Sequence, residues 1–436
     1  MTHWTAGTAL AASLLLVLFL PGSAVAQPCI VDQVTDTTGD PNLPNSNEES
    51  TISSDGLWIA FQSNAEPVPA SNPDGNFEVW LYDVAGDSFS QITVTGSSGN
   101  VRPAISGDGL WVAFEGSPEL FPSGTSPIAL YDVAGASILQ ITNTLAGSSR
   151  YPEVNGNGTL VSFVSNTDIV AGGNPDGNPE LFLYDRTAGT FIQVTTTVGG
   201  QAEISSLDAA GNLLAFSSTA DVIAGGNVDG NSEVFLYDVP TATTTQITNT
   251  LGGGSYSPDL SHDGAWLALQ SNRDLVAGGN LDANIEVFLY DNAGATFSQV
   301  TNLTGLESYA PSLNQDGTRL AFASFNDPTG ANPDANNELF LFDVLTSEIT
   351  QITDTTGPSF FYMMGVSLSG DGERIAFDSY SNVTGSNGDG NREVYLASCG
   401  TAAFGPAIPV ASGWGLVVFA VLTVLAAIRV LLKATK

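Results

Sequence analysis

The sequence predicts an all-β fold, a seven-bladed β-propeller, and three observations carry this prediction. A closing Gln-Ile-Thr or Gln-Val-Thr tripeptide recurs in steps of 49, 53, 53, 53 and 52 residues, at Gln91, Gln140, Gln193, Gln246, Gln299 and Gln351. Each repeat contains four short segments with strand-like patterning, as a propeller blade does. The last repeat has only three such segments, and the missing fourth lies near the N-terminus.

The repeat is clearest between residues 256 and 301. Its strands are expected at 257–261, 265–270, 286–291 and 297–301. His262-Asp263-Gly264 has the composition of a hairpin turn between the first two strands. A loop at 271–284 precedes the third strand, and Ala293-Gly294 turns the chain into the fourth. Four antiparallel strands in this order make one blade.

The third strand of the repeat is apolar on both faces. Val287 and Leu289 lie on one face, and Phe288 and Tyr290 lie on the other. A strand with two apolar faces is buried on both, as a blade between two neighbours requires. The units are expected to begin near Ser50, Arg102, Tyr151, Ala202, Ser257, Ala310 and Gly365.

The two cysteines support closure of the ring through the N-terminus. Residues 29–35 end in Gln-Val-Thr and supply the fourth strand that the last unit lacks. Cys399 aligns with Val84 and Cys29 with Asp87, and these two positions flank a hairpin turn in the first unit. Two cysteines in an exported chain usually pair. We therefore expect a Cys29–Cys399 disulfide in place of that turn, rather than two free thiols.

Both ends of the chain carry targeting features. Residues 1–26 have an apolar run followed by Ala24-Val25-Ala26, which indicates a cleaved signal peptide rather than a membrane anchor. Residues 27–400 form the propeller, and 401–407 form a linker. In the tail, 408–436, an uncharged run is long enough to cross a bilayer and precedes Arg429, Lys433 and Lys436. The positive end marks the cytoplasmic side, so the propeller is expected on the far side.

The body of the chain is strongly acidic. All 45 Asp and Glu lie within residues 27–407, against seven Arg and no Lys, which gives this region a net charge of −38. Such a field repels nucleic acid and anionic lipid and favours cations and basic partners. We expect no nucleic-acid partner.

The pattern S-x-D-G-x-x-[IL]-A-F-x-S, followed by N-x-D-G-N-x-E-[IV]-[FY]-[LV]-Y-D, resembles the WD40-like PD40 repeats of TolB-type β-propellers. The resemblance covers most of the chain. It implies a propeller that serves as a protein-binding module, as a gate on a peptidase or as a free-standing exported protein. The chain shows no pattern of an appended hydrolase domain.

The tail resembles the IPTL-CTERM sorting signal of Gram-negative bacteria. The matching I-P-x-x-S-x-W-G box consists of Ile408, Pro409, Ser412, Trp414 and Gly415. An apolar helix and a basic end follow the box. The resemblance implies export, a C-terminal transmembrane helix and recognition by a sorting machinery, in the periplasm or at the cell surface. A plain C-terminal anchor is the alternative.

Six loops that precede the third strands hold the best candidate metal ligands. The spacing N-x-D-x-N-x-E places side-chain oxygens at every second residue, as in compact Ca²⁺ loops. The candidates are Asn72, Asp74, Asn76 and Glu78; Asn174, Asp176, Asn178 and Glu180; Asn227, Asp229, Asn231 and Glu233; Asn280, Asp282, Asn284 and Glu286; Asn332, Asp334, Asn336 and Glu338; and Asn387, Asp389, Asn391 and Glu393.

A structural role for these loops is the alternative, since Asp and Asn readily form Asx-turns with local backbone. Each loop has only two carboxylates, which favours structural turns over calcium. In a four-stranded blade these loops and the connections between blades leave on the same face. Six acidic loops therefore ring one face, the expected surface for a protein or surface-polymer partner.

Catalytic signals are weak. His262 is the only histidine after the signal peptide, and we interpret it as a solvated turn residue. No nucleophile elbow, zinc-ligand set or phosphate-binding glycine loop occurs. Trp58, Trp111 and Trp266 follow the Asp-Gly turns and are interpreted as blade packing rather than sugar platforms.

We therefore expect a non-catalytic binding or scaffold module at the cell envelope, with Ca²⁺ as the one candidate cofactor. A carboxylate-dependent hydrolase or lyase with its site in the propeller channel is the first alternative. A structural acidic surface or matrix protein is the second.

Overall fold

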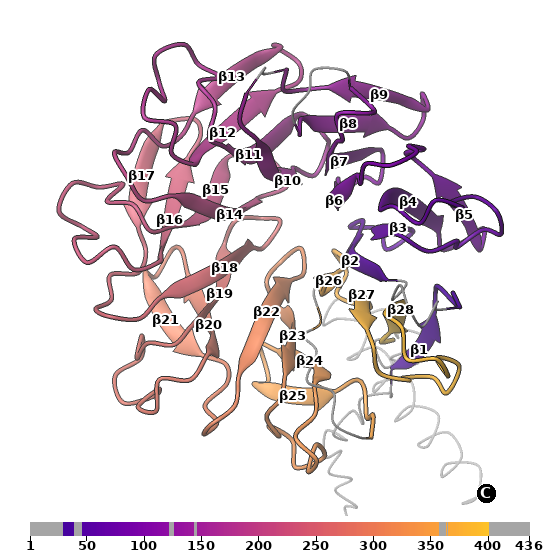
Figure 1. Cartoon of the computed structure of the whole chain (residues 1–436). Coiled ribbons are helices and arrows are strands. Elements are labelled where there is room, and N and C mark those ends of the chain that lie inside the picture. The colour runs from indigo at the N-terminus through magenta and orange to yellow at the C-terminus, as the bar shows by residue number, and fades with distance from the viewer. Residues whose placement is uncertain are drawn as a thin grey trace, which may run out of the picture. The chain divides into compact units, whose positions relative to one another are not determined.

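The computed structural model describes residues 29–38, 46–121, 126–143, 146–356, 363 and 365–400. These residues form 28 strands in seven four-stranded sheets, arranged in a ring around a central axis (Figure 1). The all-β seven-bladed propeller is confirmed. Within the described ranges no helix has the length and apolar character needed to span a bilayer. The expected signal peptide, linker, sorting box and transmembrane helix lie outside these ranges.

We name the strands of each blade A to D, from the central axis outward. Blade 1 consists of β2 (Asn47–Ile52), β3 (Trp58–Ser63), β4 (Glu78–Asp83) and β5 (Ser88–Gln91). Blade 2 consists of β6 (Val101–Ile105), β7 (Trp111–Glu115), β8 (Ile128–Asp132) and β9 (Ser137–Gln140). Blade 3 consists of β10 (Ser149–Val154), β11 (Leu160–Ser165), β12 (Glu180–Asp185) and β13 (Thr190–Gln193). Blade 4 consists of β14 (Ala202–Leu207), β15 (Leu213–Ser218), β16 (Glu233–Asp238) and β17 (Thr243–Gln246).

The remaining blades follow the same order. Blade 5 consists of β18 (Ser255–Leu260), β19 (Trp266–Ser271), β20 (Glu286–Asp291) and β21 (Thr296–Gln299). Blade 6 consists of β22 (Ser308–Leu313), β23 (Arg319–Ser324), β24 (Glu338–Asp343) and β25 (Glu348–Gln351). Blade 7 consists of β26 (Ser367–Leu368), β27 (Arg374–Ser379), β28 (Glu393–Ser398) and, as strand D, β1 (Ile30–Gln33).

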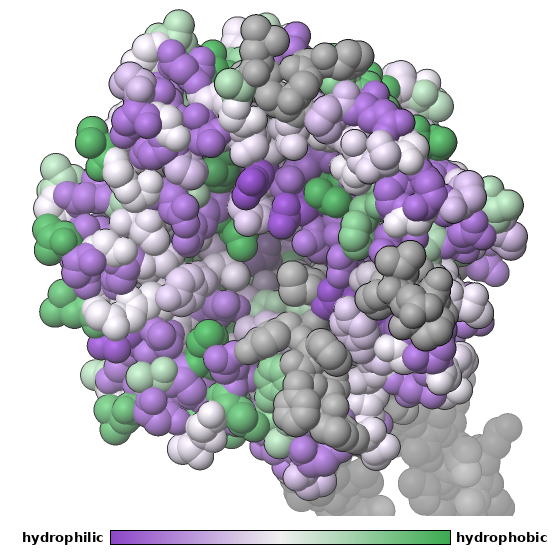
Figure 2. All heavy atoms as spheres, viewed as in Figure 1, coloured by the Kyte–Doolittle hydropathy of each residue, from purple (hydrophilic) through white to green (hydrophobic). Residues whose placement is uncertain are grey.

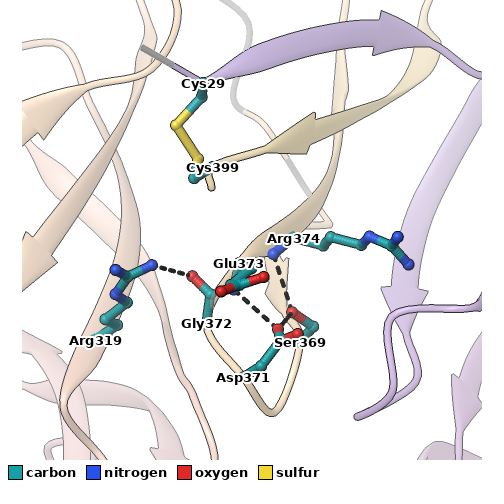
Figure 3. Close-up of a disulfide and its surroundings, with 8 residues drawn as sticks. All are labelled: Cys29, Arg319, Ser369, Asp371, Gly372, Glu373, Arg374 and Cys399. Atoms are coloured by element: carbon teal, nitrogen blue, oxygen red, sulfur yellow. Dashed lines mark hydrogen bonds between the residues drawn. A yellow bond between two sulfur atoms is a disulfide. The ribbon is translucent and has the colours of Figure 1, made fainter. Parts of the chain in front are cut away.

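The N-terminal strand closes the ring as predicted. β1 pairs antiparallel with β28, from Ile30 opposite Ser398 to Gln33 opposite Tyr395. The predicted disulfide joins Cys29 to Cys399 at the end of this pair, over a separation of 370 residues (Figure 3). The chain-entropy model gives about 6 kcal/mol of stabilisation for a loop of that length. A disulfide also indicates an oxidising, extracytoplasmic location.

The hydrophobic core lies between neighbouring blades. Strands B and C contribute stacked ring pairs such as Phe163–Phe182 and Phe216–Phe235, with centroids 5.8 and 5.4 Å apart. One apolar cluster combines Ala113 of blade 2 with Phe163 of blade 3, and the other clusters likewise join adjacent blades. Because each blade is covered on both faces, its third strand is apolar on both, which is the pattern that the sequence shows.

The tryptophans that follow the Asp-Gly turns pack blade against blade, as interpreted from the sequence. A Cβ added to Gly158 would lie 2.1 Å from Trp111 Cδ1, and one added to Gly317 would lie 2.2 Å from Trp266 Cδ1. Both glycines have positive φ and belong to the turn of the next blade. In blade 6, Arg319 takes the tryptophan's place and donates to the carbonyl of Gly372 at 2.8 Å (Figure 3).

The innermost strands carry a recurrent bulge that positions the central site. Register shifts interrupt the A–B pairing in blades 1 to 6. Five bulge residues have φ between 47° and 53°: Glu49, Arg102, Tyr151, Ser257 and Ala310. A non-glycine residue in this region costs about 1 kcal/mol. The bulge directs these residues toward the axis.

Candidate functional site

The site is a cavity of about 560 Å³ on the axis of the ring, lined by strand A of every blade. Figure 2 shows the hollow at the centre of the ring. Equivalent residues of the seven repeats line it in three layers. The rim layer consists of the bulge positions Glu49, Arg102, Tyr151, Ile204, Ser257, Ala310 and Gly365. The middle layer, two residues further on, consists of Thr51, Ala104, Glu153, Ser206, Asp259, Ser312 and Ser367. The turn layer, three further still, includes Ser54, Gly107, Gly156, Ala209 and His262.

The turn layer is closed by backbone hydrogen bonds between neighbouring blades. Gly156 N–H donates to Ala209 O at 3.1 Å, and Ala209 N–H donates to His262 O at 3.0 Å. Similar bonds link all seven neighbouring pairs, and Gly370 N–H donates to Ser54 O at 2.8 Å to complete the circle. Gly156 has no room for a side chain here, because a Cβ on it would lie 2.8 Å from the Cβ of Ala209.

His262 narrows the same end of the cavity. Its Nδ1 lies 3.1 Å from Ser54 Oγ, so the side chain reaches from blade 5 to blade 1. Burial lowers the pKa of the imidazole, against the opposing effect of Asp263. The predicted turn is confirmed, whereas the predicted solvated side chain is wrong: it is half-buried, because the turn faces the axis rather than the outside. Access to the cavity is therefore through the rim.

Most middle-layer residues bond to the next blade. Backbone N–H groups donate to Thr51 Oγ1 from Ile105 at 3.3 Å, and to Ser206 Oγ from Leu260 at 3.0 Å. Ser312 and Ser367 accept equivalent bonds, and so does a carboxylate oxygen of Asp259. These side chains hold the blades together. Ala104 and Glu153 depart from the pattern.

Glu153 and Asp259 are the two acidic side chains of the middle layer. Burial raises the pKa of Glu153 to about 8, and the negative charge of Asp259 adds to the rise. Burial raises the pKa of Asp259 to about 7, although bonds from Leu313 N–H (2.7 Å) and Ser206 Oγ (3.3 Å) act in the opposite direction. The carboxyl of Glu153 forms no hydrogen bond or ion pair with any residue that the structure describes. The side chain is partly exposed to the cavity, and it lacks a positive partner among the described residues.

The rim layer is lopsided. On one side, Arg102 Nη1 lies 3.1 Å from Glu115 Oε1, and Arg102 Nε lies 3.8 Å from Glu49 Oε1. The Arg102 guanidinium also lies over the ring of Tyr151, 4.8 Å from its centroid. Burial raises the pKa of Glu49 to about 7, and Arg102 offsets part of that rise. On the other side, the rim has only small residues. The charged groups of the rim therefore lie on blades 1 and 2, whereas the rim positions of blades 5 to 7 carry no charge.

The predicted calcium ligands lie in the B–C loops, away from this cavity, where they form hydrogen bonds of a repeated kind. Asn174 Nδ2 donates to the backbone carbonyl of Asn178 at 2.8 Å, within the same loop. Asn178 Nδ2 donates at 3.1 Å to Thr197 Oγ1 of the D–A connection. Glu180 is buried and accepts from the side chain of Thr195 and the backbone N–H of Thr197, the latter at 2.6 Å. The motif therefore joins each B–C loop to the adjacent D–A connection.

The same loops contain buried oxygens that lack a hydrogen-bond donor. They are side-chain carbonyl oxygens of the motif asparagines: Asn76, Asn174, Asn178, Asn227, Asn231, Asn280, Asn284, Asn332, Asn336 and Asn391. Within the described ranges, no three His, Cys, Asp or Glu residues gather closely enough to hold a metal ion. Any cation in these loops would therefore depend on amide oxygens and on the exposed central Asp of each motif.

The rim and the acidic loops share one face of the propeller. Asn100, two residues before Arg102 of the rim, donates its N–H to Phe77 O of a B–C loop at 2.8 Å. The cavity therefore opens on the face that the six acidic loops surround.

Comparison with known proteins shows the fold and no more. No family model matches the chain, and no curated protein matches it. An oligogalacturonate lyase from Vibrio parahaemolyticus is 13% identical, with 86% of this chain and 97% of that chain covered and a TM-score of 0.54. The β-propeller domain of the trilobed protease from Pyrococcus furiosus is 12% identical, with 82% and 96% covered and a TM-score of 0.54. TolB from Acinetobacter baumannii is 17% identical, with 82% and 80% covered and a TM-score of 0.43.

Proposed function

We propose that this protein is an exported, non-catalytic binding module of the bacterial cell envelope whose central cavity takes a positively charged group of a ligand or protein partner. The observation that carries the proposal is Glu153, a partly buried carboxyl that lines the cavity and has no positive partner among the described residues. Buried charges in proteins are normally paired. When Glu153 is ionised, a cation between Glu153 and Asp259 supplies the positive partner that the described residues lack.

The surroundings of the cavity suit such a ligand. The acidic body attracts cations from solution and raises their local concentration at the rim. The turn layer blocks the opposite end, so a charged group that enters through the rim stops near the middle layer. The rest of a protein or polymer partner would then cover the face with the acidic loops. Export is supported by the disulfide and by the signal-peptide pattern.

Calorimetric titration with hexylamine tests the proposal, with hexanol as the uncharged control. We expect hexylamine to bind and hexanol to give no signal. Glu153→Gln should remove most of the binding. Glu348→Gln, the same change on the exposed outer strand β25, should leave it unchanged. Equal signals from the amine and the alcohol, or an unchanged affinity in Glu153→Gln, would overturn the proposal.

A second candidate function is a carboxylate-dependent hydrolase or lyase in the same cavity. It is favoured by two carboxyls whose pKa values lie near neutrality, because acid–base catalysis works best there. Turnover of an oligosaccharide or ester panel, lost in Glu153→Gln and kept in Glu348→Gln, would establish it.

We also propose that the six B–C loops bind calcium weakly and stiffen the loop face. The unpartnered asparagine oxygens support this, since Ca²⁺ accepts amide carbonyls as ligands. Scanning calorimetry in millimolar Ca²⁺ and in EDTA provides the test, and we expect a higher melting temperature with calcium. Asp176→Asn should reduce the shift. Identical melting curves in the two buffers would show that the loops do not bind calcium and that their role is structural.

A further inference from the structure

A second cavity adjoins the central one on the loop face. Its volume is about 640 Å³, and residues of blades 3, 4 and 5 line it. Three rim-layer residues line both cavities: Tyr151, Ile204 and Ser257. Because the two spaces share one wall of the rim, a ligand that enters the central cavity also has room above blades 3 to 5.

The second cavity contains an arginine with no structural role in the described residues. Arg150 is exposed, and its guanidinium forms no hydrogen bond or ion pair with any of them. Arg392 pairs with Glu48 at 2.6 Å, and Arg374 donates to Gly56 O at 2.7 Å. The guanidinium of Arg273 also has no partner among the described residues, but Arg273 lines neither cavity.

The other charged residue that lines this cavity is Glu203, and its carboxylate already accepts hydrogen bonds within the protein. Glu203 accepts a hydrogen bond from Ser232 Oγ at 2.8 Å and another from Gln201 Nε2 at 3.4 Å. Burial and the nearby negative charge of Glu203 raise the pKa of Tyr256, so its phenol stays neutral. Arg150 is therefore the group in the second cavity that remains available for an anion.

Strand β10 sets the positions of the two opposite charges. Arg150 and Glu153 are separated by the register shift in this strand, so one lines the second cavity and the other lines the central cavity. The two cavities therefore present a cation and an anion on the two sides of Tyr151.

From this geometry we propose that the two cavities form a single site for an elongated zwitterion, with an ammonium group at one end and a carboxylate at the other. The ammonium lies between Glu153 and Asp259, and the carboxylate accepts hydrogen bonds from Arg150. The inference rests on the proposed function, because it assumes that the central cavity holds the cationic end. It adds the second charge and the orientation of the ligand. Arginine binds carboxylates through two parallel hydrogen bonds, which gives both affinity and direction.

Matched ligands of one chain length separate the two charges. Titration calorimetry would compare hexylamine, 6-aminohexanoate and 1,6-diaminohexane on the disulfide-bonded protein, followed by 4-aminobutanoate and 8-aminooctanoate for the length. We expect 6-aminohexanoate to bind about tenfold more tightly than hexylamine, the effect of one charge-assisted hydrogen bond. The diamine should bind no better than hexylamine, because Arg150 repels its second ammonium.

Arg150→Gln should abolish the advantage of 6-aminohexanoate and leave the affinity for hexylamine unchanged. Arg273→Gln is the matched control, because Arg273 lies outside both cavities. Equal affinities for hexylamine and for every amino acid of the series would overturn the zwitterion site and leave the proposed function intact. Failure of all these amines and amino acids to bind the unaltered protein would overturn both. Melting temperatures of the variants would show that each one folds.

Discussion

Blade 3 contains two glutamates with opposite surroundings, one buried in the fold and one partly exposed to the central cavity. Glu180 ends a B–C loop, and Thr195, Thr197 and Asn178 all donate hydrogen bonds to its carboxylate. Glu153 lies in the central cavity and receives no hydrogen bond from any described residue. Glu180 belongs to a motif found in six repeats, whereas Glu153 stands where four other blades have Thr or Ser. The comparison indicates that Glu180, which recurs in the repeats, stabilises the fold, whereas Glu153, which does not recur, is available to bind a ligand.

The largest expected effect comes from Glu180→Gln. The amide cannot accept every bond that the carboxylate accepts, so buried Thr donors lose their partner. We expect a loss of about 3 kcal/mol in the free energy of unfolding at pH 7, measured by chemical denaturation. A variant as stable as the unaltered protein would show that the hydrogen bonds around Glu180 do not hold the loop.

The same substitution at Glu153 should have the opposite sign. The pKa of Glu153 is raised in the folded chain, so the folded state holds the proton more tightly than the unfolded state. The stability that this group contributes therefore falls as pH rises from about 4.5 to about 8. We expect Glu153→Gln to stabilise the protein by about 2 kcal/mol at pH 9, with little effect at pH 4. Destabilisation at pH 9 would contradict the absence of a positive partner.

The affinity for a cation should follow the same ionisation. Hexylamine binds the ionised carboxyls, whose pKa values are about 8 for Glu153 and about 7 for Asp259. Its affinity should therefore rise about tenfold between pH 6 and pH 8.5, and binding should release protons to the buffer. Calorimetry in two buffers of different ionisation enthalpy measures that release. A flat pH profile would place the amine elsewhere on the acidic surface.

Much of the fold could be predicted from the sequence because each blade repeats the same local signals. The Asp-Gly turns, the doubly apolar third strand and the Gln-Ile-Thr ending recur at a constant period. The position of the closing strand and of the Cys29–Cys399 bridge followed from the same alignment. These features depend on neighbours in the chain or on the neighbouring repeat.

The central site could not be predicted in the same way, because strands from seven blades meet there. Thr51, Ser206, Ser312 and Ser367 share a hydroxyl at one repeat position, and Glu153 breaks that pattern. The acidic residue at this repeat position is the one signal of the site that the sequence contains. Only the structure shows that Glu153 lines a cavity, where desolvation raises the pKa of its carboxyl. The loop residues show that spacing in the sequence can also suggest a role without revealing the contacts that the residues make. Oxygen spacing around Glu180 suggested metal ligands, yet it could not reveal that Thr197, 17 residues later, donates to that carboxylate.

The most direct measurement is a carbon-13 NMR titration of the Glu153 carboxyl, with and without saturating hexylamine. Without the amine, we predict an apparent pKa near 8 for the carboxyl pair that Glu153 forms with Asp259. With the amine bound, the pKa should fall toward the ordinary range of glutamate, because a cation favours the ionised form. An ordinary pKa in the free protein, or a raised pKa that the amine does not change, would contradict a cation site in the central cavity.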